Sequence, residues 1–411
     1  MIPYSTQCID EEDIRAVEQV LRSDFLTCGP RVAEFEDCLC SYTEANFAIA
    51  TSNATAALHL CMMAMDVGAD DEVWVSAISF VASANCARYC GATVRFIDVD
   101  AHTGNLDVNC LESMLIDARK NNKKLPKAVV AVHLSGRPCD MAALGRLRDE
   151  YGFFLVEDAS HALGATYEGV QTGKTVYSDV AVFSFHPVKI ITTAEGGACL
   201  TDNEKLASRI RLLHSHGITH DTALMTWRDM PAWYYEQIDL GYNYRMSDLQ
   251  AALGISQMSR LDSFISRRRQ LARDYVDILD QNIIRLPAAD KEGFESSWHL
   301  YQIQVEHRDH IYNTLRQKGV GAQIHYIPIY RHPYYQKQPY NQHLEGAEFF
   351  YSHTLTIPLH PKINRVDQSM VASIIASALD KFPADLKSQQ SSLSAAALYV
   401  RAIPCGTDRA M

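Results

Sequence analysis

Short apolar runs and amphipathic segments alternate along the first half of the chain. Each run of strand length is followed by a segment whose apolar residues recur at helical spacing. The predicted strands are 46–50, 72–75, 93–97, 128–132 and 153–156, and the predicted helices between them are 56–65, 79–89, 111–119 and 141–151. Strands that alternate with helices are typical of βαβ units. The pattern therefore predicts an α/β domain with a mostly parallel sheet.

A single lysine stands in the loop between two later apolar runs. The run 180–185 leads into a turn at His186 and Pro187, and Lys189 follows in a segment of small and hydroxyl residues that ends at Gly197. A lysine held out of bulk water in such a loop has a lowered pKa, and its neutral amine is a nucleophile. The alternative is a hairpin with a solvated lysine at its tip, and the loop pattern alone leaves both open.

An acidic pair ends another apolar run. Glu157 and Asp158 follow the run 153–156, and ligands in open α/β sheets bind at the carboxyl ends of the strands. A lysine that forms a Schiff base and an aspartate that faces a pyridinium nitrogen are the protein groups that pyridoxal phosphate requires. Asp158 could instead cap the segment that follows it.

The start of the predicted helix 56–65 suits an anion. The segment 51–55 supplies hydroxyl and amide side chains, and the free N–H groups and dipole of a helix start favour a phosphate. Capping of the helix by these side chains is the alternative, and it is the commoner role of such residues.

The second half of the chain follows a different pattern after a polar interruption at 237–246. One long helical run is predicted from 247 through 275, then a strand at 298–305, a helix at 310–318, a strand at 322–326 and a last helix at 367–381. We interpret this as the crossing into a smaller domain. The predicted boundaries are 1–255 for the large domain, which includes N-terminal helices at 9–21 and 32–42, 256–382 for the small domain, and 383–411 for a poorly ordered tail.

Composition narrows the classes of function. The 411 residues carry a formal net charge of −11, with 47% hydrophobic and 21% charged residues, as in ordinary globular proteins. The negative charge argues against nucleic acid or an anionic membrane as a partner. The 11 cysteines are scattered, which indicates free thiols and neither disulfides nor a metal site. No signal peptide or membrane-spanning run is present in the sequence, which predicts a cytoplasmic protein.

Five stretches together resemble one family, the aminotransferases that act on nucleotide-linked keto-sugars, which are fold type I pyridoxal-phosphate enzymes. The likeness covers about residues 3–382 and is greatest to the branch in pseudaminic acid biosynthesis. His161 stands where many members carry Gln, and Ile190 where close relatives often have Pro. The matching stretches are TSNATAALHL at 51–60, VEDASHALGA at 156–165, FSFHPVKIITTAEGG at 183–197, GYNYRMSDLQAALG at 241–254 and AQIHYIPIY at 322–330.

The resemblance implies a large domain with a mostly parallel seven-stranded sheet flanked by helices, a smaller α+β C-terminal domain, and a set of site residues. Lys189 would form the Schiff base with pyridoxal 5′-phosphate and carry a proton, and Asp158 would face the ring nitrogen. The cofactor would also contact Ala54, Thr55 and Ser184 at its phosphate, Phe80 over its ring, His161 at its ring hydroxyl and, from a neighbouring subunit, Asn243. Residues expected at the sugar are Gly29, Arg245, His325 and Tyr326, although Gly29 by its sequence is only a turn.

The reaction that the resemblance implies is transfer of an amino group from L-glutamate to C4 of a UDP-linked 4-keto-6-deoxy-N-acetylhexosamine, in a homodimer with shared active sites. A 4-aminotransferase for the D-epimer or for a dTDP-linked sugar is an open alternative. Two other classes are a sugar dehydratase, which carries His in place of the Schiff-base lysine, and a non-catalytic sensor, which would be expected to lose Lys189 or Asp158. This chain has both residues, which favours the aminotransferase.

Overall fold

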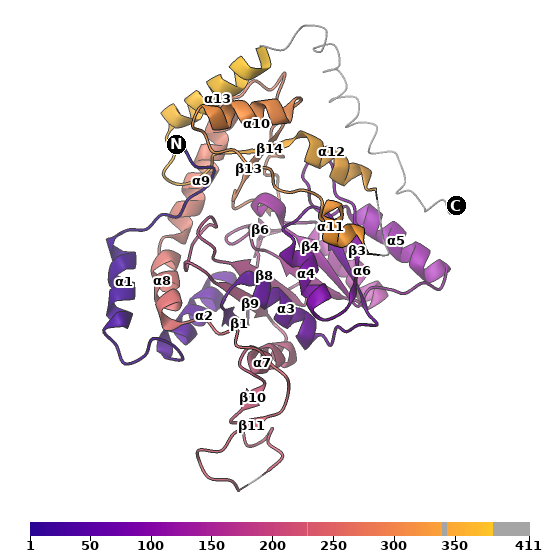
Figure 1. The fold of residues 1–411 in the computed structure, drawn as a ribbon, viewed down its shortest axis with the longest axis vertical. Coiled ribbons are helices and arrows are strands. Elements are labelled where there is room, and N and C mark those ends of the chain that lie inside the picture. Colours follow the sequence, from indigo (N-terminus) through magenta and orange to yellow (C-terminus); the bar gives the residue numbers. More distant parts are fainter. Residues whose placement is uncertain (228, 339–342, 381–411) are drawn as a thin grey trace.

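A seven-stranded sheet forms the centre of the computed structural model, which describes residues 1–227, 229–338 and 343–380 (Figure 1). The strand order is β1-β9-β8-β5-β4-β2-β3. Pairings among β2, β3, β4, β5 and β8 are parallel, and β9 is antiparallel to both β8 and β1. The predicted α/β fold with a mostly parallel sheet is confirmed. The strands are β1 Phe47–Thr51, β2 Glu72–Ser76, β3 Thr93–Ile97, β4 Ala128–Val132, β5 Phe154–Asp158, β8 Val180–Ser184 and β9 Gly197–Thr201.

Helices cover both faces of this sheet because successive strand residues point to opposite sides. In β2, Val73 and Val75 enter one apolar cluster, whereas Trp74 enters another. The first cluster contains α3 Ala54–Ala64, α4 Ala82–Tyr89 and α7 Glu204–Leu213, and the second contains α5 Val108–Lys120 and α6 Met141–Tyr151. Beside β1 and β9, a third cluster is built with α2 Pro30–Thr43 and α8 Asp248–Met258.

A fourth apolar cluster lies in the C-terminal part of the chain. It joins α9 Leu261–Ile278, α10 Arg308–Gln317 and α13 Arg365–Asp380 to the two-stranded sheet of β13 Tyr301–Gln304 and β14 Thr354–Ile357. The predicted division after residue 255 falls within α8 and stays a prediction. The expected tail at 383–411 lies outside the described residues. None of the helices in the described ranges is both long and apolar enough to cross a bilayer.

Shorter elements complete the described chain. An arm at residues 214–244 projects away from the body below α7 in Figure 1, and its base is the pair β10 Ile218–Thr219 and β11 Glu236–Gln237. The others are α1 Glu11–Leu21, β6 Thr166–Tyr167, β7 Val170–Gln171, β12 Phe294–Glu295, α11 Pro333–Gln336, α12 Glu345–His353 and the 3₁₀ turns Leu134–Gly136 and Ile329–Arg331.

Two elements predicted from the sequence have a different secondary structure in the protein. The helical run 247–275 is two helices, because the backbone leaves helical values at Arg260, whose side chain turns to the carboxylates of Asp10 and Asp13 beside α1. The predicted strand 322–326 pairs only at Gln323, with Thr356. Within the described residues, Ala322 and His325 are buried without further strand pairing.

Candidate active site

Three strand ends bring sequence-predicted residues to one edge of the sheet. Asp158 is the last residue of β5, and Ser184 is the last residue of β8. Because β9 is antiparallel to both of its neighbours, its first residue, Gly197, pairs with Ser184 on one side and with Thr51 on the other. This carboxyl edge is where parallel sheets place their ligand sites.

The carboxylate of Asp158 is held by two hydroxyl groups. Its side chain is buried, with 5% of its surface exposed. Ser83 Oγ donates a hydrogen bond to Oδ2 at 2.5 Å, and Ser160 Oγ donates one to Oδ1 at 2.6 Å. Ser79 in turn contacts the Ser83 hydroxyl at 2.6 Å. The donors fix the orientation of the carboxylate and leave it capacity to accept from a ligand.

The negative charge of Asp158 affects the pKa of Lys189. The backbone N–H of Lys189 closes a turn onto the carbonyl of His186 at 2.8 Å. Desolvation by burial lowers the pKa of Lys189 to about 8, and the negative charge of Asp158 opposes this shift. Within the described residues, Nζ has no hydrogen-bond partner. The loop therefore holds an amine that is partly neutral near physiological pH, as nucleophilic lysines require.

Three histidines surround this lysine, and all are expected to be neutral. Burial, together with the positive charge of Lys189, lowers the pKa of His161 and of His299 well below the usual value and lowers the pKa of His325 to about 3. The rings of His161 and His299 are 4.4 Å apart. His325 Nδ1 is 2.8 Å from the hydroxyl of Thr356.

The contacts of His161 determine which ring nitrogen carries its proton. The backbone N–H of Ser135 donates to Nδ1 at 3.2 Å, so in a neutral ring Nε2 bears the hydrogen. Nε2 lies 3.1 Å from the hydroxyl of Tyr326. Nε2–H of His161 is therefore a hydrogen-bond donor. The side-chain amide of Gln, which many family members carry at this position, is also a donor.

The start of α3 has backbone donors without partners. Asn53 caps the helix by accepting from the N–H of Ala56 at 2.9 Å. In the described part of the chain, the N–H groups of Ala54 and Thr55 have no acceptor, and the dipole of α3 adds positive potential there. A Cβ on Gly197 would lie 2.5 Å from the nitrogen of Ala54, so only glycine allows this close approach.

Phe80 and Arg245 are two further residues that the sequence predicted for the site. Phe80 is 58% exposed, and its ring is 6.3 Å from that of Tyr326. Arg245 pairs with Thr51 through the backbone and donates to Ser215 Oγ at 2.9 Å, which places it at the base of the arm beside α3.

Asn243 and Gly29 lie outside the cluster around Lys189. Asn243 is exposed at the base of the arm, where its backbone pairs with Ser215. Gly29 begins α2, and its N–H donates to Asp248 at 2.8 Å. A Cβ there would lie 2.5 Å from that of Phe25. Among the described contacts, none joins Gly29 to Lys189, and packing accounts for its glycine.

Comparison with known proteins places this site in a family. The model of the DegT/DnrJ/EryC1/StrS aminotransferase family matches residues 7–376. The chain belongs to this family. It is 37% identical over 386 residues to the UDP-4-amino-4,6-dideoxy-N-acetyl-β-L-altrosamine transaminase of Campylobacter jejuni, a match that covers 93% of this chain and 98% of the relative.

Solved structures agree with the family assignment. Helicobacter pylori PseC, an aminotransferase involved in the biosynthesis of pseudoaminic acid, superposes with a TM-score of 0.83 at 31% identity, over 93% of this chain and 100% of PseC. The PLP form of the putative sugar aminotransferase Spr1654 from Streptococcus pneumoniae superposes with a TM-score of 0.83 at 29% identity, over 92% and 99% of the two chains. The protein is a sugar aminotransferase that depends on pyridoxal phosphate.

The residues of this sugar aminotransferase fit that cofactor. The unpaired N–H groups at the start of α3 suit a phosphate. The buried carboxylate of Asp158 suits a protonated ring nitrogen, and the amine of Lys189 suits an aldehyde. Gly197 lets the β9 backbone pack directly against the start of α3. Each of the three polar parts of the cofactor thus has a complementary group on the same sheet edge.

Several residues of the site were not predicted from the sequence. Ser83 and Ser160 bind Asp158, and Ser135 sets the proton on His161. His299 packs on His161, and its buried Nδ1 has no hydrogen-bond partner in the described part of the chain. Ser160 could have been found, since it lies two residues from Asp158. Ser135 and His299 come from distant segments and carry no local signal.

Proposed function

We propose that this aminotransferase moves an amino group from L-glutamate to C4 of a UDP-linked 4-keto-6-deoxy-N-acetylhexosamine, a step of pseudaminic acid biosynthesis. The observation that carries the proposal is the 37% identity to the Campylobacter jejuni transaminase along nearly the full length of both chains. The Lys189 and Asp158 arrangement supports transamination, because a dehydratase of this family would have His at the lysine position.

The chain's own residues have distinct roles in this proposal. When bound, pyridoxal phosphate supplies an electron-withdrawing ring that stabilises negative charge at the α-carbon of the amino donor. Asp158 holds the proton on the ring nitrogen, because a buried anion beside that nitrogen stabilises its cation. Nζ of Lys189 would hold the aldehyde of the cofactor, and the free amine would accept the proton that leaves the α-carbon of glutamate.

Other residues position the cofactor and the sugar. The N–H groups of Ala54 and Thr55, with the hydroxyl of Ser184, bind the phosphate. Nε2–H of His161 donates to the ring oxygen. The exposed ring of Phe80 stacks on the cofactor. At the sugar we place Arg245, His325, Tyr326 and, from the resemblance alone, Gly29.

We further propose a homodimer in which Asn243 reaches the phosphate of the second copy. The arm, which carries Asn243 at its base, supports this because it exposes many apolar side chains: Leu224 58%, Trp227 65%, Met230 44%, Trp233 74%, Tyr235 52% and Leu240 73%. A patch of this kind marks an interaction surface.

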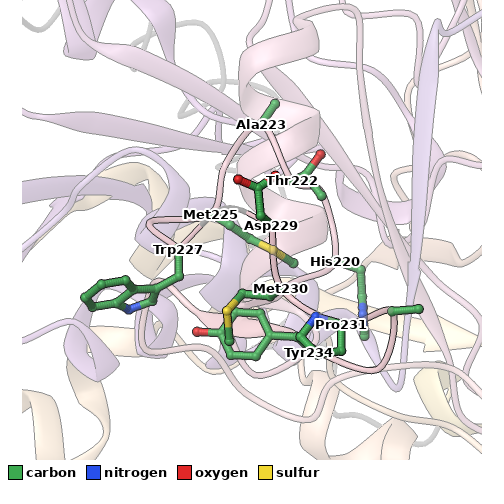
Figure 2. A pocket seen from close by; sticks show the side chains of 10 residues that line it. His220, Thr222, Ala223, Met225, Trp227, Asp229, Met230, Pro231 and Tyr234 are labelled. Carbon is green, nitrogen blue, oxygen red and sulfur yellow. The ribbon is translucent and has the colours of Figure 1, made fainter.

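A pocket of about 490 Å³ lies within the arm between His220 and Tyr234 (Figure 2). Glu236 orders its rim by accepting the N–H groups of Thr226 and Trp227, each at 2.7 Å.

Mixing two inactive variants tests the shared site. Lys189→Ala and Asn243→Ala chains, exchanged in equal amounts, should recover about a quarter of the wild-type sites, because half of the dimers are mixed and each has one intact site. The matched control mixes Lys189→Ala with Asp158→Asn. Both of those residues act within their own subunit, so that mixture should stay inactive. No recovery in the first mixture, with exchange proven by mass spectrometry, would refute the shared site.

A substrate panel tests the sugar. The purified enzyme, loaded with pyridoxal phosphate and glutamate, is given the UDP-linked β-L-arabino 4-keto sugar, its D-xylo epimer and a dTDP-linked 4-keto sugar. We expect the highest kcat/KM for the first. Shape discrimination in such pockets is about 1 to 3 kcal/mol, so the preference over the epimer should be roughly 10- to 200-fold. A higher kcat/KM for either alternative would overturn the pathway and leave the aminotransferase intact.

A further inference from the structure

The first residues of the chain are bound to the C-terminal part and not to the large sheet. The N–H of Ile2 donates to the carbonyl of Gly319 at 2.9 Å, and the carbonyl of Ile2 accepts the N–H of Gly321 at 2.6 Å. Two residues later, the carbonyl of Tyr4 accepts the N–H of Leu359 at 3.0 Å. Residues 2–5 are therefore held at a defined register by backbone bonds from two separate segments.

Gly321 shows how closely this N-terminal segment packs. A Cβ at that position would lie 2.9 Å from the nitrogen of Tyr4 and 3.0 Å from the carbonyl oxygen of Ile2. These distances leave little room for any side chain. The chain then continues directly from Gly321 to His325 and Tyr326, so the N-terminal segment runs beside the stretch that carries the sugar-site residues.

Ser5 connects the same segment to the lysine loop. Its side chain is buried, with 6% exposed, and its Oγ donates a hydrogen bond to the carbonyl of Val188 at 2.8 Å. The next residue is Lys189. One buried hydrogen bond thus fixes the backbone that delivers the amine.

Tyr4 lies on the side of the segment that faces the site. Its ring is 5.2 Å from that of His325. The ring of His325 is in turn 4.9 Å from that of Tyr326. Among the described residues, the Tyr4 hydroxyl has no hydrogen-bond partner. Burial raises the pKa of Tyr4, so its hydroxyl keeps its proton and can donate it in a hydrogen bond.

We propose that residues 2–5 form one wall of the keto-sugar site, in which Tyr4 contacts the sugar and Ser5 positions the Lys189 loop. This inference rests on the proposed function. A tyrosine offers an apolar ring to the 6-methyl side of a deoxy sugar and one donor to a sugar oxygen. Tyr4 is thus a specificity residue, and Ser5 is a positioning residue.

The two half-reactions separate these roles. The holoenzyme is mixed with glutamate alone, and its aminated form is then mixed with the UDP-linked keto-sugar; the visible absorbance of the cofactor reports each step. Tyr4→Phe and Tyr4→Ala should raise the keto-sugar concentration at half-maximal rate by roughly 5-fold and by tenfold or more, because a lost hydrogen bond is worth about 1 kcal/mol and the ring more. The glutamate step should change less than about twofold.

Ser5→Ala should show a different signature. Because Val188 precedes the lysine, loss of the Ser5 hydrogen bond should slow both half-reactions by a similar factor. Thr6→Ala is the matched control, since within the described residues the Thr6 hydroxyl donates a hydrogen bond only to its neighbour Gln7, at 3.4 Å. Calorimetric titration of the holoenzyme with the aminated UDP-sugar gives a second readout, in which the Tyr4 variants should bind more weakly and Thr6→Ala should not.

Each outcome decides between these possibilities. Equal loss in both half-reactions for Tyr4→Phe would reduce Tyr4 to a structural role and overturn the proposal, as would unchanged sugar binding in Tyr4→Ala. If the wild-type enzyme completes the glutamate step and then reacts with no UDP-linked keto-sugar, the proposed function fails, and this inference fails with it. Wild-type turnover with unaffected Tyr4 variants would overturn this inference and leave the proposed function intact.

Discussion

Capture of pyridoxal phosphate by the cofactor-free protein measures the environment of Lys189 directly. Only the neutral amine attacks an aldehyde, so the capture rate follows the deprotonated fraction of Lys189. Its pKa is lowered from 10.5 to about 8. At pH 7.5 this shift raises the neutral fraction from roughly 0.1% to roughly a quarter, a gain of more than a hundredfold in reactive amine.

The assay is stopped-flow absorbance of the mixed protein and cofactor between pH 6 and 10. The second-order rate constant should rise with pH and level off above a midpoint near 8, because deprotonation of Lys189 is complete there. Pyridoxal phosphate has ionisations of its own. The same titration with a lysine model peptide corrects for these ionisations. The ratio of the two rate constants then gives the effect of the protein environment on the lysine.

The variant Asp158→Asn tests the direction in which the Asp158 charge shifts the pKa of Lys189. The Asp158 carboxylate raises the pKa of Lys189 against the effect of burial. Its removal should therefore move the midpoint to lower pH, even though turnover falls. Glu195→Gln removes an exposed charge from the same loop and should leave the midpoint in place. A midpoint near that of the model peptide, or one that rises in Asp158→Asn, would refute this account of the site.

Two further results are expected. Borohydride treatment of the yellow holoenzyme should fix the cofactor on Lys189, and peptide mapping should leave Lys174 unlabelled, because Lys174 is paired with Asp202 at 3.1 Å; a label on Lys174 would contradict the assignment. Gly197→Ala should weaken cofactor binding and cost about 1 to 3 kcal/mol of stability, since the new Cβ would overlap the start of α3. Thermal denaturation and cofactor titration measure both effects, and Gly68→Ala, with no atom within 4 Å of the added Cβ, is the control that should change neither.

The sequence predicts best those elements whose bounds depend on neighbouring residues in the chain. The strands β3 and β4 and the helix α6 have the predicted bounds, because their apolar patterns are clear and turn residues flank them. The lysine loop and the acid at the end of β5 were also predicted, since each follows directly from an apolar run. Local pattern thus locates the two residues with the most distinctive chemistry.

What the sequence did not predict depends on contacts between distant segments. The arm was missed because its β10 and β11 strands have two residues each and pair across the sixteen positions between Thr219 and Glu236. The bond from Ser83 to Asp158 joins residues 75 positions apart. The break lies at Arg260, whose side chain pairs with Asp10 and Asp13 near the start of the chain. Neither hydrophobic periodicity nor turn chemistry records such pairings.

The position of β1 has a consequence for the order in which the chain folds. Phe47–Thr51 is an early strand, yet its partner in the sheet is Gly197–Thr201, so β1 and the start of α3 stay without that support until the residues of β9 emerge from the ribosome. Residues 2–4 wait longer, for Gly319 and Leu359. Loop closure over such separations is slow. The cofactor end of the site therefore waits for the residues of β9, and the N-terminal segment waits for nearly the whole polypeptide. A fragment released before β9 would expose an unpaired strand to chaperones and proteases.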